Sequence, residues 1–463
     1  MKKNLVLGIA IIMLFSMVTL TSAQEKAKEW TFMVFLNADN NLDRFGVSDL
    51  NEMETVGSTD KVNIVVCMDR EHGPANYFYV TKDNTSAIKS KIVKSMGEMD
   101  MGDYKEMVKF VKFCKDDYPA KKYCLVVWNH GSGWKLKKQE EIFKGLSYDD
   151  SSNNHMTTPQ LGLGLKQINA VLGKKLDIFS NDACLMAMLE ISAEIKDYCN
   201  YFVASEETEP GDGYGYHYIL PSLAKTPTQS AETFAKKMVT GYASSYSSSS
   251  QSTTQSAVAQ SKVSALIAKV GVLGNAMNAT DDLAAIKTAH DAAQKFYYKD
   301  NVDIIHFATL LASKTKDAKV KSAAKAVVTA GEAAVTQNAV TGYKTKNSKG
   351  IAIYMPKYSM SSAYKKIALG KTDWVNGIAA VAKAFSSQKA EVADSVFNME
   401  YPGIVAQAIK LEMQNNNFEN FESLLKMGDT DALSILKKDI GTEILKGNHI
   451  ELKGQFNRMF EVK

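Results

Sequence analysis

The chain has 463 residues, of which 45% are hydrophobic and 23% are charged, and its formal net charge is +4. These values are typical of an ordinary soluble globular protein with two or three domains, or with one large domain and additions to it. The small net charge and the scattered lysines exclude a basic stripe for nucleic acid, and beyond the N-terminus no segment has the ~18 consecutive apolar residues of a membrane-spanning helix.

Residues 1–23 have the pattern of a cleaved secretory signal peptide. Lys2 and Lys3 precede an apolar run at 5–20, and small residues follow at 21–23. This pattern predicts export to a periplasm or out of a bacterial cell. Because no cysteine lies near the junction, we expect no lipid anchor after the signal is removed.

Short apolar segments then alternate with stretches of helical periodicity. The segments are rich in β-branched and aromatic residues, which predicts strands buried on both faces of a mostly parallel sheet. The predicted strands are residues 30–37, 62–68, 77–82, 123–129, 176–182, 201–207 and 350–356, and the predicted helices include 104–117, 158–173 and 185–197. This alternation indicates an α/β sandwich.

Residues from about 231 to 340 are rich in Ala, Lys and Ser and have helical character. A serine-rich run interrupts them, and the alternation in TTQSAVAQ at its end allows one further short strand. We expect a helical insertion at about 260–345 that covers a single domain of residues 24–385. Residues 386–463 have no strand signal and are expected to form a helical C-terminal region.

Two predicted strands end in residues that could carry out catalysis. One continues into His130 and Gly131, and the other into Asp182, Ala183 and Cys184. Since the carboxyl ends of parallel strands face one crevice, we expect both groups on the same rim. The thiolate form of cysteine is a nucleophile, and the pKa of the thiol falls near a histidine or a helix N-terminus. An imidazole can carry the proton that a leaving amine needs. The backbone N–H groups of Gly131 and Cys184 would form an oxyanion hole.

Each of these residues alone also has a structural explanation. A histidine after a strand is commonly a turn residue, and a cysteine in an apolar element is commonly an inert buried thiol. The five cysteines form no CxxC, and the chain has no HExxH or GxSxG, so a zinc site and a serine-hydrolase elbow are unsupported. An odd number of cysteines leaves at least one thiol free or paired between chains.

Segments 101–134, 146–161, 176–195 and 204–216 resemble the clostripain family of cysteine peptidases, which has the caspase-like fold. The resemblance covers residues from about 28 to 385 and rests on a strand ending in His-Gly followed by one ending in Asp-Ala-Cys. It implies a caspase-like α/β/α sandwich with a mostly parallel central sheet. It also implies that Cys184 is the nucleophile, that His130 is the acid/base and that cleavage follows Arg or Lys.

Specificity for basic residues requires an acid beside the thiol, because an unpaired cation is costly to bury. Asp182 matches the acid of the Asp-Ala-Cys block, and Asp212 lies in a segment that usually shapes the pocket wall. Asp182 could instead cap a helix, and Asp212 could be a local turn residue. Glu207 and Glu209 remain rivals for the second position.

Members of the family are often made as inactive precursors that are cut between the histidine and cysteine strands. Here the loop 135–150 offers several lysines, and we expect self-cleavage between Lys144 and Gly145, where glycine opens the backbone. The alternative is an ordinary exposed loop.

Some family members depend on calcium, and no other cofactor is expected. Candidate oxygen ligands are Asp39, Asn40 and Asp43, or Asp149 and Asp150, but neither set has the spacing of a calcium-binding loop and both could be turns.

Two other functions stay open. The same thiol and imidazole could serve a transpeptidase or an asparagine-specific peptidase, although acids near the thiol favour a basic side chain. The chain could also be an exported binding or scaffold protein that has lost the chemistry.

Overall fold

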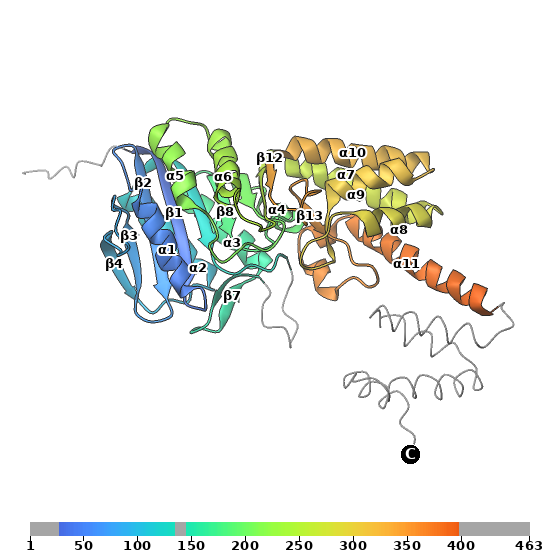
Figure 1. Ribbon diagram of the computed structural model, residues 1–463, viewed down its shortest axis with the longest axis horizontal. Helices are drawn as coiled ribbons and strands as arrows, with labels where there is room; N and C mark the ends of the chain where they lie inside the picture. The colour runs from blue at the N-terminus through green and yellow to red at the C-terminus, as the bar shows by residue number, and fades with distance from the viewer. Residues whose placement is uncertain (1–26, 135–144, 398–463) are drawn as a thin grey trace, which may run out of the picture.

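The computed structural model describes residues 27–134 and 145–397 (Figure 1). A nine-stranded sheet in the order β12-β10-β9-β8-β5-β1-β2-β3-β4 forms its centre. The strands of this sheet are β1 (Lys28–Ala38), β2 (Val62–Arg70), β3 (Ala75–Tyr79), β4 (Lys91–Gly97), β5 (Ala120–Trp128), β8 (Leu176–Asp182), β9 (Cys199–Ala204), β10 (Thr254–Ala259) and β12 (Val335–Val340). The pairs β6 (Leu146–Asp149) with β7 (Asn154–Met156) and β11 (Asn301–Asp303) with β13 (Ala352–Tyr354) form two small sheets.

The five central strands, from β2 to β9, run parallel, and the strands at both ends of the sheet are antiparallel. Alternate residues of a strand point to opposite faces, so a strand covered on both faces can be apolar throughout. In β1, Met33 and Phe35 enter one core, while Phe32, Val34 and Leu36 enter the other. The mostly parallel central sheet predicted from the sequence is confirmed.

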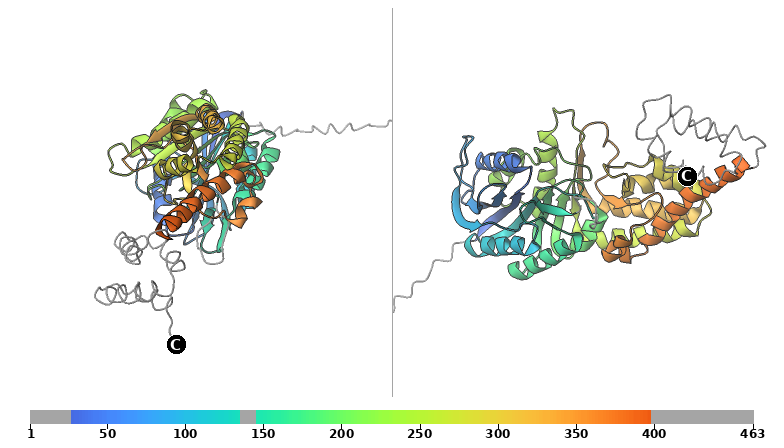
Figure 2. Two further views of the ribbon diagram at one scale, coloured as in Figure 1. Left: turned by 90° about the vertical axis from the view of Figure 1, so that its right-hand side faces the viewer. Right: turned by 90° about the horizontal axis from the view of Figure 1, so that it is seen from below.

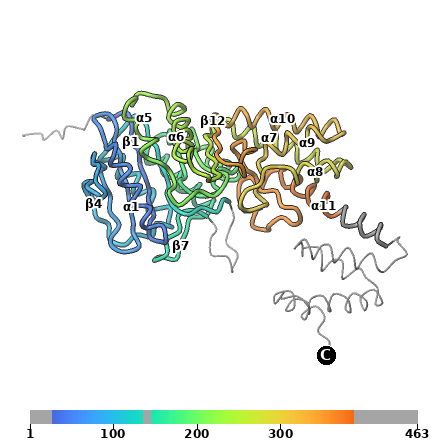
Figure 3. Tube along the Cα trace, in the orientation of Figure 1, coloured from blue at the N-terminus to red at the C-terminus, as the bar shows by residue number. Residues whose placement is uncertain are grey.

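Helices cover both faces of the sheet, as the right-hand view of Figure 2 shows. One layer consists of α1 (Asp43–Glu54), α5 (Tyr216–Lys225) and α6 (Ala231–Ser245), and the other contains α2 (Tyr104–Asp117), α3 (Thr158–Leu172) and α4 (Leu189–Ile195). The chain then continues into a helical group beside the β12 end of the sheet (Figure 3). This group contains α7 (Gln260–Ala279), α8 (Leu283–Ala292), α9 (Ile304–Lys314), α10 (Ala318–Ala334) and α11 (Trp374–Phe397), with short 3-10 turns at Ser362–Lys366 and Leu369–Lys371.

Several predicted elements differ from the observed ones. The segment GIAIYMP forms β13, which pairs with β11 outside the main sheet, so its assignment to that sheet was wrong. The short strand expected in TTQSAVAQ is β10, and it joins the main sheet. The edge strand β12 was missed because its sequence, VTQNAV, is half polar and only partly buried. It lies inside the stretch predicted to be wholly helical.

The predicted domain limits, 24–385 and 386–463, stay a prediction. Helix α11 continues through residue 385, and residues 398–463 lie outside the described part of the chain, as does the predicted signal peptide.

Candidate active site

The strands β5 and β8 bring the two predicted catalytic segments to one edge of the sheet. They are paired in parallel with Trp128 opposite Asp182, and the N–H of Asn129 donates to the Asp182 carbonyl at 3.2 Å. The next residues on each side are therefore His130 with Gly131 and Ala183 with Cys184. This is the common rim that the parallel strand order predicted.

Gly131 is in close contact with the cysteine segment. A Cβ atom at this position would lie 2.4 Å from the Cys184 carbonyl oxygen and 3.1 Å from the Ala183 Cβ. Side-chain atoms do not approach other atoms this closely, so a glycine is needed for the two strand ends to meet. The contact joins the histidine segment to the cysteine segment through their backbones.

The side chain of Asn129 fixes the start of the histidine segment. Its amide donates to the Asn37 carbonyl at 2.7 Å and to the Tyr148 carbonyl at 3.1 Å, and its oxygen accepts the Tyr148 N–H at 2.6 Å. One buried amide thus joins the ends of β5, β1 and β6. These bonds hold the backbone from which His130 projects.

The ring of His130 contacts Asn41 and Tyr148. Its Nε2 lies 2.7 Å from the Asn41 Oδ1, and its plane meets the Tyr148 ring edge-on at 6.5 Å between centroids. Because an amide oxygen only accepts, Nε2 carries the proton in the neutral ring and Nδ1 is the basic nitrogen. Burial lowers the pKa of His130, and the charge of Asp150 opposes this shift. The neutral form is the one that can accept a proton.

Cys184 is half-buried, whereas the other four cysteines are fully buried, and none of the five forms a disulfide. Its Sγ accepts the N–H of Glu209 at 3.2 Å. Burial raises the pKa of the thiol, and this hydrogen bond partly offsets the rise. The thiol therefore needs a base to remove its proton near neutral pH.

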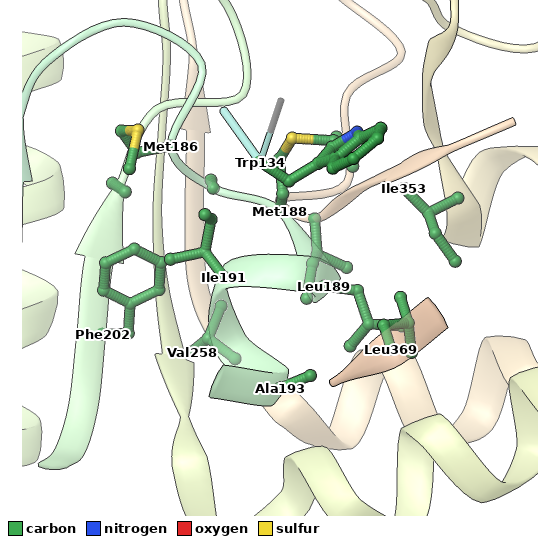
Figure 4. Packing of buried hydrophobic residues seen from close by; sticks show 14 of the residues in the cluster. Trp134, Met186, Met188, Leu189, Ile191, Ala193, Phe202, Val258, Ile353 and Leu369 are labelled. Atoms are coloured by element: carbon green, nitrogen blue, oxygen red, sulfur yellow. The ribbon is translucent and has the colours of Figure 1, made fainter. Parts of the chain in front are cut away.

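The segment after Cys184 is not helical, which corrects the expectation of a helix starting at residue 185. Leu185 has a φ of 65°, which lies in the left-handed region, where a residue other than glycine is strained. The Leu185 N–H donates to the Glu207 carbonyl at 3.1 Å. Helix α4 starts only at Leu189, so a helix N-terminus does not lie next to the thiol. Figure 4 shows Met186 and Met188 among the packed core side chains, which anchors this extended turn.

Asp182 lies beneath the rim and does not cap a helix. Its carboxylate accepts the Tyr214 N–H at 3.1 Å and the Tyr216 hydroxyl at 2.9 Å. A Cβ on Gly213 would lie 2.6 Å from the same carboxylate, so this loop closes tightly over it. Burial raises the pKa of Asp182 to about 7.

Two further acids accompany Asp182: Glu209, which the sequence indicated as a rival for the pocket, and Asp49, which it did not indicate. The carboxyl group of Glu209 is buried and shares a side-chain hydrogen bond with the Asp182 carboxyl group. Burial raises the pKa of Glu209, and Asp182 and Cys184 raise it further. Asp49 on α1 accepts the Trp128 Nε1–H at 2.6 Å. A group of buried acids thus lies next to the thiol.

The remaining predicted site residues are Asp212 and Lys144. Asp212 is exposed beside Gly213, and its charge acts on the buried Asp49. Lys144 lies outside the described residues, but Gly145 is anchored: its N–H donates to the Ser132 Oγ at 2.6 Å, and its carbonyl accepts the Ser132 N–H at 3.0 Å. The residue on the C-terminal side of the predicted processing bond is therefore hydrogen-bonded to Ser132, two residues after His130.

The two predicted sets of calcium ligands do not form two sites. Asp39 and Asp149 come together with Glu98. Asp43 instead binds Arg70 at 2.7 Å, and Asn40 donates to the Tyr148 carbonyl at 2.9 Å. Among the described residues, no helix is long and apolar enough to span a membrane.

A sequence model described as the clostripain family matches residues 34–394. Clostripain from Hathewaya histolytica is 27% identical over 236 residues, which is 44% of this chain and 44% of that relative, so the alignment spans less than half of its length. The fold is similar to a secreted C11 cysteine protease from Bacteroides thetaiotaomicron named iotapain, with a TM-score of 0.61 and 18% identity over 76% of this chain and 99% of that one. It is also similar to an inactive zymogen C11 protease from Parabacteroides distasonis, with a TM-score of 0.58 and 17% identity over 75% and 98% of the two chains.

Proposed function

Because this chain belongs to the clostripain family of cysteine peptidases, we propose that it is an exported endopeptidase that cleaves after Arg or Lys through a dyad of Cys184 and His130. The contact of Gly131 with the Cys184 carbonyl carries this proposal, since it joins the one incompletely buried thiol to the histidine segment. The signal-like N-terminus supports export.

In the proposed reaction the basic Nδ1 of His130 takes the proton from the Cys184 thiol, and the resulting thiolate attacks the scissile carbonyl carbon. The backbone N–H groups of Gly131 and Cys184 would stabilise the oxyanion. As the C–N bond breaks, His130 gives its proton to the leaving amine. A water then attacks the thioester, His130 accepts its proton, the C–S bond breaks, and the proton returns to the thiolate.

The acids near the thiol would receive the basic side chain. A guanidinium or ammonium group needs an anionic partner when it leaves water, and Asp182 and Asp212 are the proposed partners. Glu209 remains a rival, and a specific observation favours it: among the described residues its buried carboxyl group is hydrogen-bonded only to the Asp182 carboxyl, whereas Asp182 also accepts from Tyr214 and Tyr216. An incoming cation would supply the missing donors.

We further propose that the enzyme activates itself by cutting Lys144–Gly145. Gly145 is held against Ser132, two residues after His130, so the bond borders the proposed dyad. Cleavage there would free a chain end at the rim of the site.

The proposed function is tested by comparing the mature protein with Cys184→Ala on short peptides whose last residue before the cleaved bond is Arg, Lys, Asn or Ala. We expect the wild type to cleave after Arg or Lys and the variant to cleave none of them. Equal hydrolysis by both proteins would overturn the dyad, and cleavage only after Asn would overturn the specificity.

A further inference from the structure

The loop of residues 293–300, between α8 and β11, carries an exposed aromatic ring beside the proposed active site. The side chain of Tyr297 is 64% exposed, although its backbone is held: the Tyr297 N–H donates to the Glu207 Oε1 at 3.0 Å. Glu207 in turn holds the residue after the proposed nucleophile, since its carbonyl accepts the Leu185 N–H at 3.1 Å. The loop is therefore bonded to the segment that follows Cys184.

The second tyrosine of the loop, Tyr298, lies toward the proposed catalytic histidine. Its ring meets the Tyr297 ring edge-on at 5.1 Å between centroids. Burial raises the pKa of Tyr148, and the neighbouring Tyr298 raises it further, so the two hydroxyl groups lie near each other. Tyr148 is the residue whose ring meets the His130 ring. The aromatic pair of Tyr297 and Tyr298 thus borders both segments of the proposed dyad.

The loop has a fixed backbone, because its polar groups are bonded within it. The Phe296 N–H donates to the Asn301 carbonyl at 3.3 Å, and the Asn301 N–H donates to the Tyr298 carbonyl at 2.9 Å. The ammonium groups of Lys295 and Lys299 donate to backbone carbonyls of the loop and of the end of α8. The Phe296 ring is fully buried and anchors the loop in the core. A ring on a rigid loop loses little conformational entropy when it binds a ligand.

The loop and the acid pocket lie on opposite faces of the sheet. The Asp182 carboxylate is bonded to Tyr214 and Tyr216, which belong to the core that faces α1, α5 and α6. Leu185 and Phe296 belong to the other core, which faces α2, α3 and α4. A substrate with its basic side chain in the acid pocket and its scissile carbonyl at the thiol would therefore have its leaving side toward the second face, where the loop lies.

We propose that Tyr297 and Tyr298 bind a large apolar or aromatic side chain of the substrate, in one of the two residues that follow the cut bond. This subsite rests on the proposed function. Aromatic rings prefer edge-on or offset contacts with other rings at about 4.5–7 Å, and tyrosine offers a large contact area with few rotatable bonds. Covering the exposed Tyr297 ring would remove apolar surface from water, which is favourable. The enzyme would thus read a basic residue before the bond and an apolar one after it.

The subsite is tested with peptides that share Arg before the cut bond and carry Gly, Leu or Phe at the first or the second position after it. Each kcat/KM is divided by the value for a small chromogenic amide of Arg, which has no residue on the leaving side, so that effects on the dyad itself cancel. In the wild type, Leu or Phe at one of the two positions should give a normalised value ~10-fold above that for Gly. Tyr297→Ala should remove this advantage, and Tyr297→Phe, which keeps the ring, should retain it.

Tyr218→Ala is the matched control. Tyr218 is also an exposed tyrosine, at 50%, but it lies on α5, on the face of the sheet away from the loop. This variant should keep the advantage of Leu and Phe over Gly. Equal values for Gly, Leu and Phe in the wild type, or an undiminished advantage in Tyr297→Ala, would overturn the subsite. A normalised value that falls equally for Gly and Phe in Tyr297→Ala would also overturn it.

Binding without cleavage separates this subsite from the proposed function. Calorimetry compares Cys184→Ala protein with the same protein carrying Tyr297→Ala, using the uncleaved Phe and Gly peptides. We expect the Phe peptide to bind ~10-fold more tightly than the Gly peptide to the first protein and no more tightly to the second. This difference in a protein that cleaves no peptide would overturn the proposed function and not the subsite. Cleavage after Arg without any advantage of Phe, in rate or in binding, would overturn the subsite and not the proposed function.

Discussion

Gly131 and Cys184 touch through their backbones at the ends of two parallel strands. A methyl group at position 131 would lie 2.4 Å from the Cys184 carbonyl oxygen, a distance at which the backbone must move. The proposed dyad therefore depends on a glycine as much as on its two reactive side chains.

Gly131→Ala should lower kcat/KM by ~100-fold or more, because a displacement of about 1 Å in an active site has an effect of that size. Overpacking of the buried contact should also lower the free energy of unfolding by ~1–3 kcal/mol. Steady-state kinetics and urea unfolding measure the two effects. Gly162→Ala is the control: its Cβ would meet the Glu194 carbonyl at 3.4 Å in an ordinary helix, so activity should not change. Full activity in Gly131→Ala would contradict the close contact.

Asn41 is expected to position the His130 ring through its 2.7 Å contact with Nε2. Asn41→Ala should reduce kcat by about 10-fold, since one lost hydrogen bond is worth ~0.5–1.5 kcal/mol and each 1.36 kcal/mol corresponds to tenfold in rate. Asn41→Asp places a carboxylate beside the ring, which favours the imidazolium and raises the pKa of His130. The acidic limb of the kcat/KM profile should then move to higher pH.

An opposite shift is expected from Asp150→Asn. The charge of Asp150 raises the pKa of His130 against the larger effect of burial. Without that charge the acidic limb should move to lower pH, while the basic limb, which reports the thiol, should stay in place. If neither Asn41→Asp nor Asp150→Asn moves the acidic limb, His130 is not the group that titrates there.

The sequence predicts the position of the proposed dyad but not its surroundings, and the reason is physical. His130 and Cys184 follow apolar strands, and parallel strands end on one rim, so their meeting follows from the strand order. Glu209 instead reaches the thiol from a loop that has no periodic signal. The turn after Cys184 was mistaken for helix because LMAMLEISAEI has helical composition, whereas the hydrogen bond from the Ala187 N–H to the Ser205 carbonyl holds it extended.

Asp182→Asn should separate specificity from stability. Burial raises the pKa of Asp182 to about 7, so the folded protein keeps a proton that the unfolded chain, with a carboxyl pKa of about 3.9, releases. The stability due to this group is complete below pH ~4 and is lost as the pH rises through about 7. Asparagine does not ionise, so the variant should match the wild type in melting temperature at about pH 4 and exceed it increasingly up to pH 8. A difference independent of pH would contradict the buried acid.

The same variant should lose activity on basic substrates. Removing one partner of a buried charge pair costs ~2–5 kcal/mol, so kcat/KM for cleavage after Arg should fall by at least about 30-fold, with little change after Ala. Glu209→Gln is the companion variant and decides between the two acids. If only Glu209→Gln loses the preference for Arg, then Glu209, and not Asp182, receives the basic side chain.

Lys144→Ala should block self-processing without harming the dyad. In the wild type, cleavage between Lys144 and Gly145 would yield two fragments on a denaturing gel, and Cys184→Ala should give one. Lys144→Ala should also give one fragment, because the bond held beside the site at Gly145 is then no longer preceded by a basic residue. Lys137→Ala, in the same loop, is the matched control and should be cut like the wild type.

The peptidase activity of Lys137→Ala should appear together with the two fragments. Lys144→Ala should stay inactive, like an uncut precursor, until an added protease specific for basic residues cuts the loop at another lysine. Two fragments from Lys144→Ala would place the processing bond at another lysine, and full activity of the uncut variant would show that cleavage is not needed for activation.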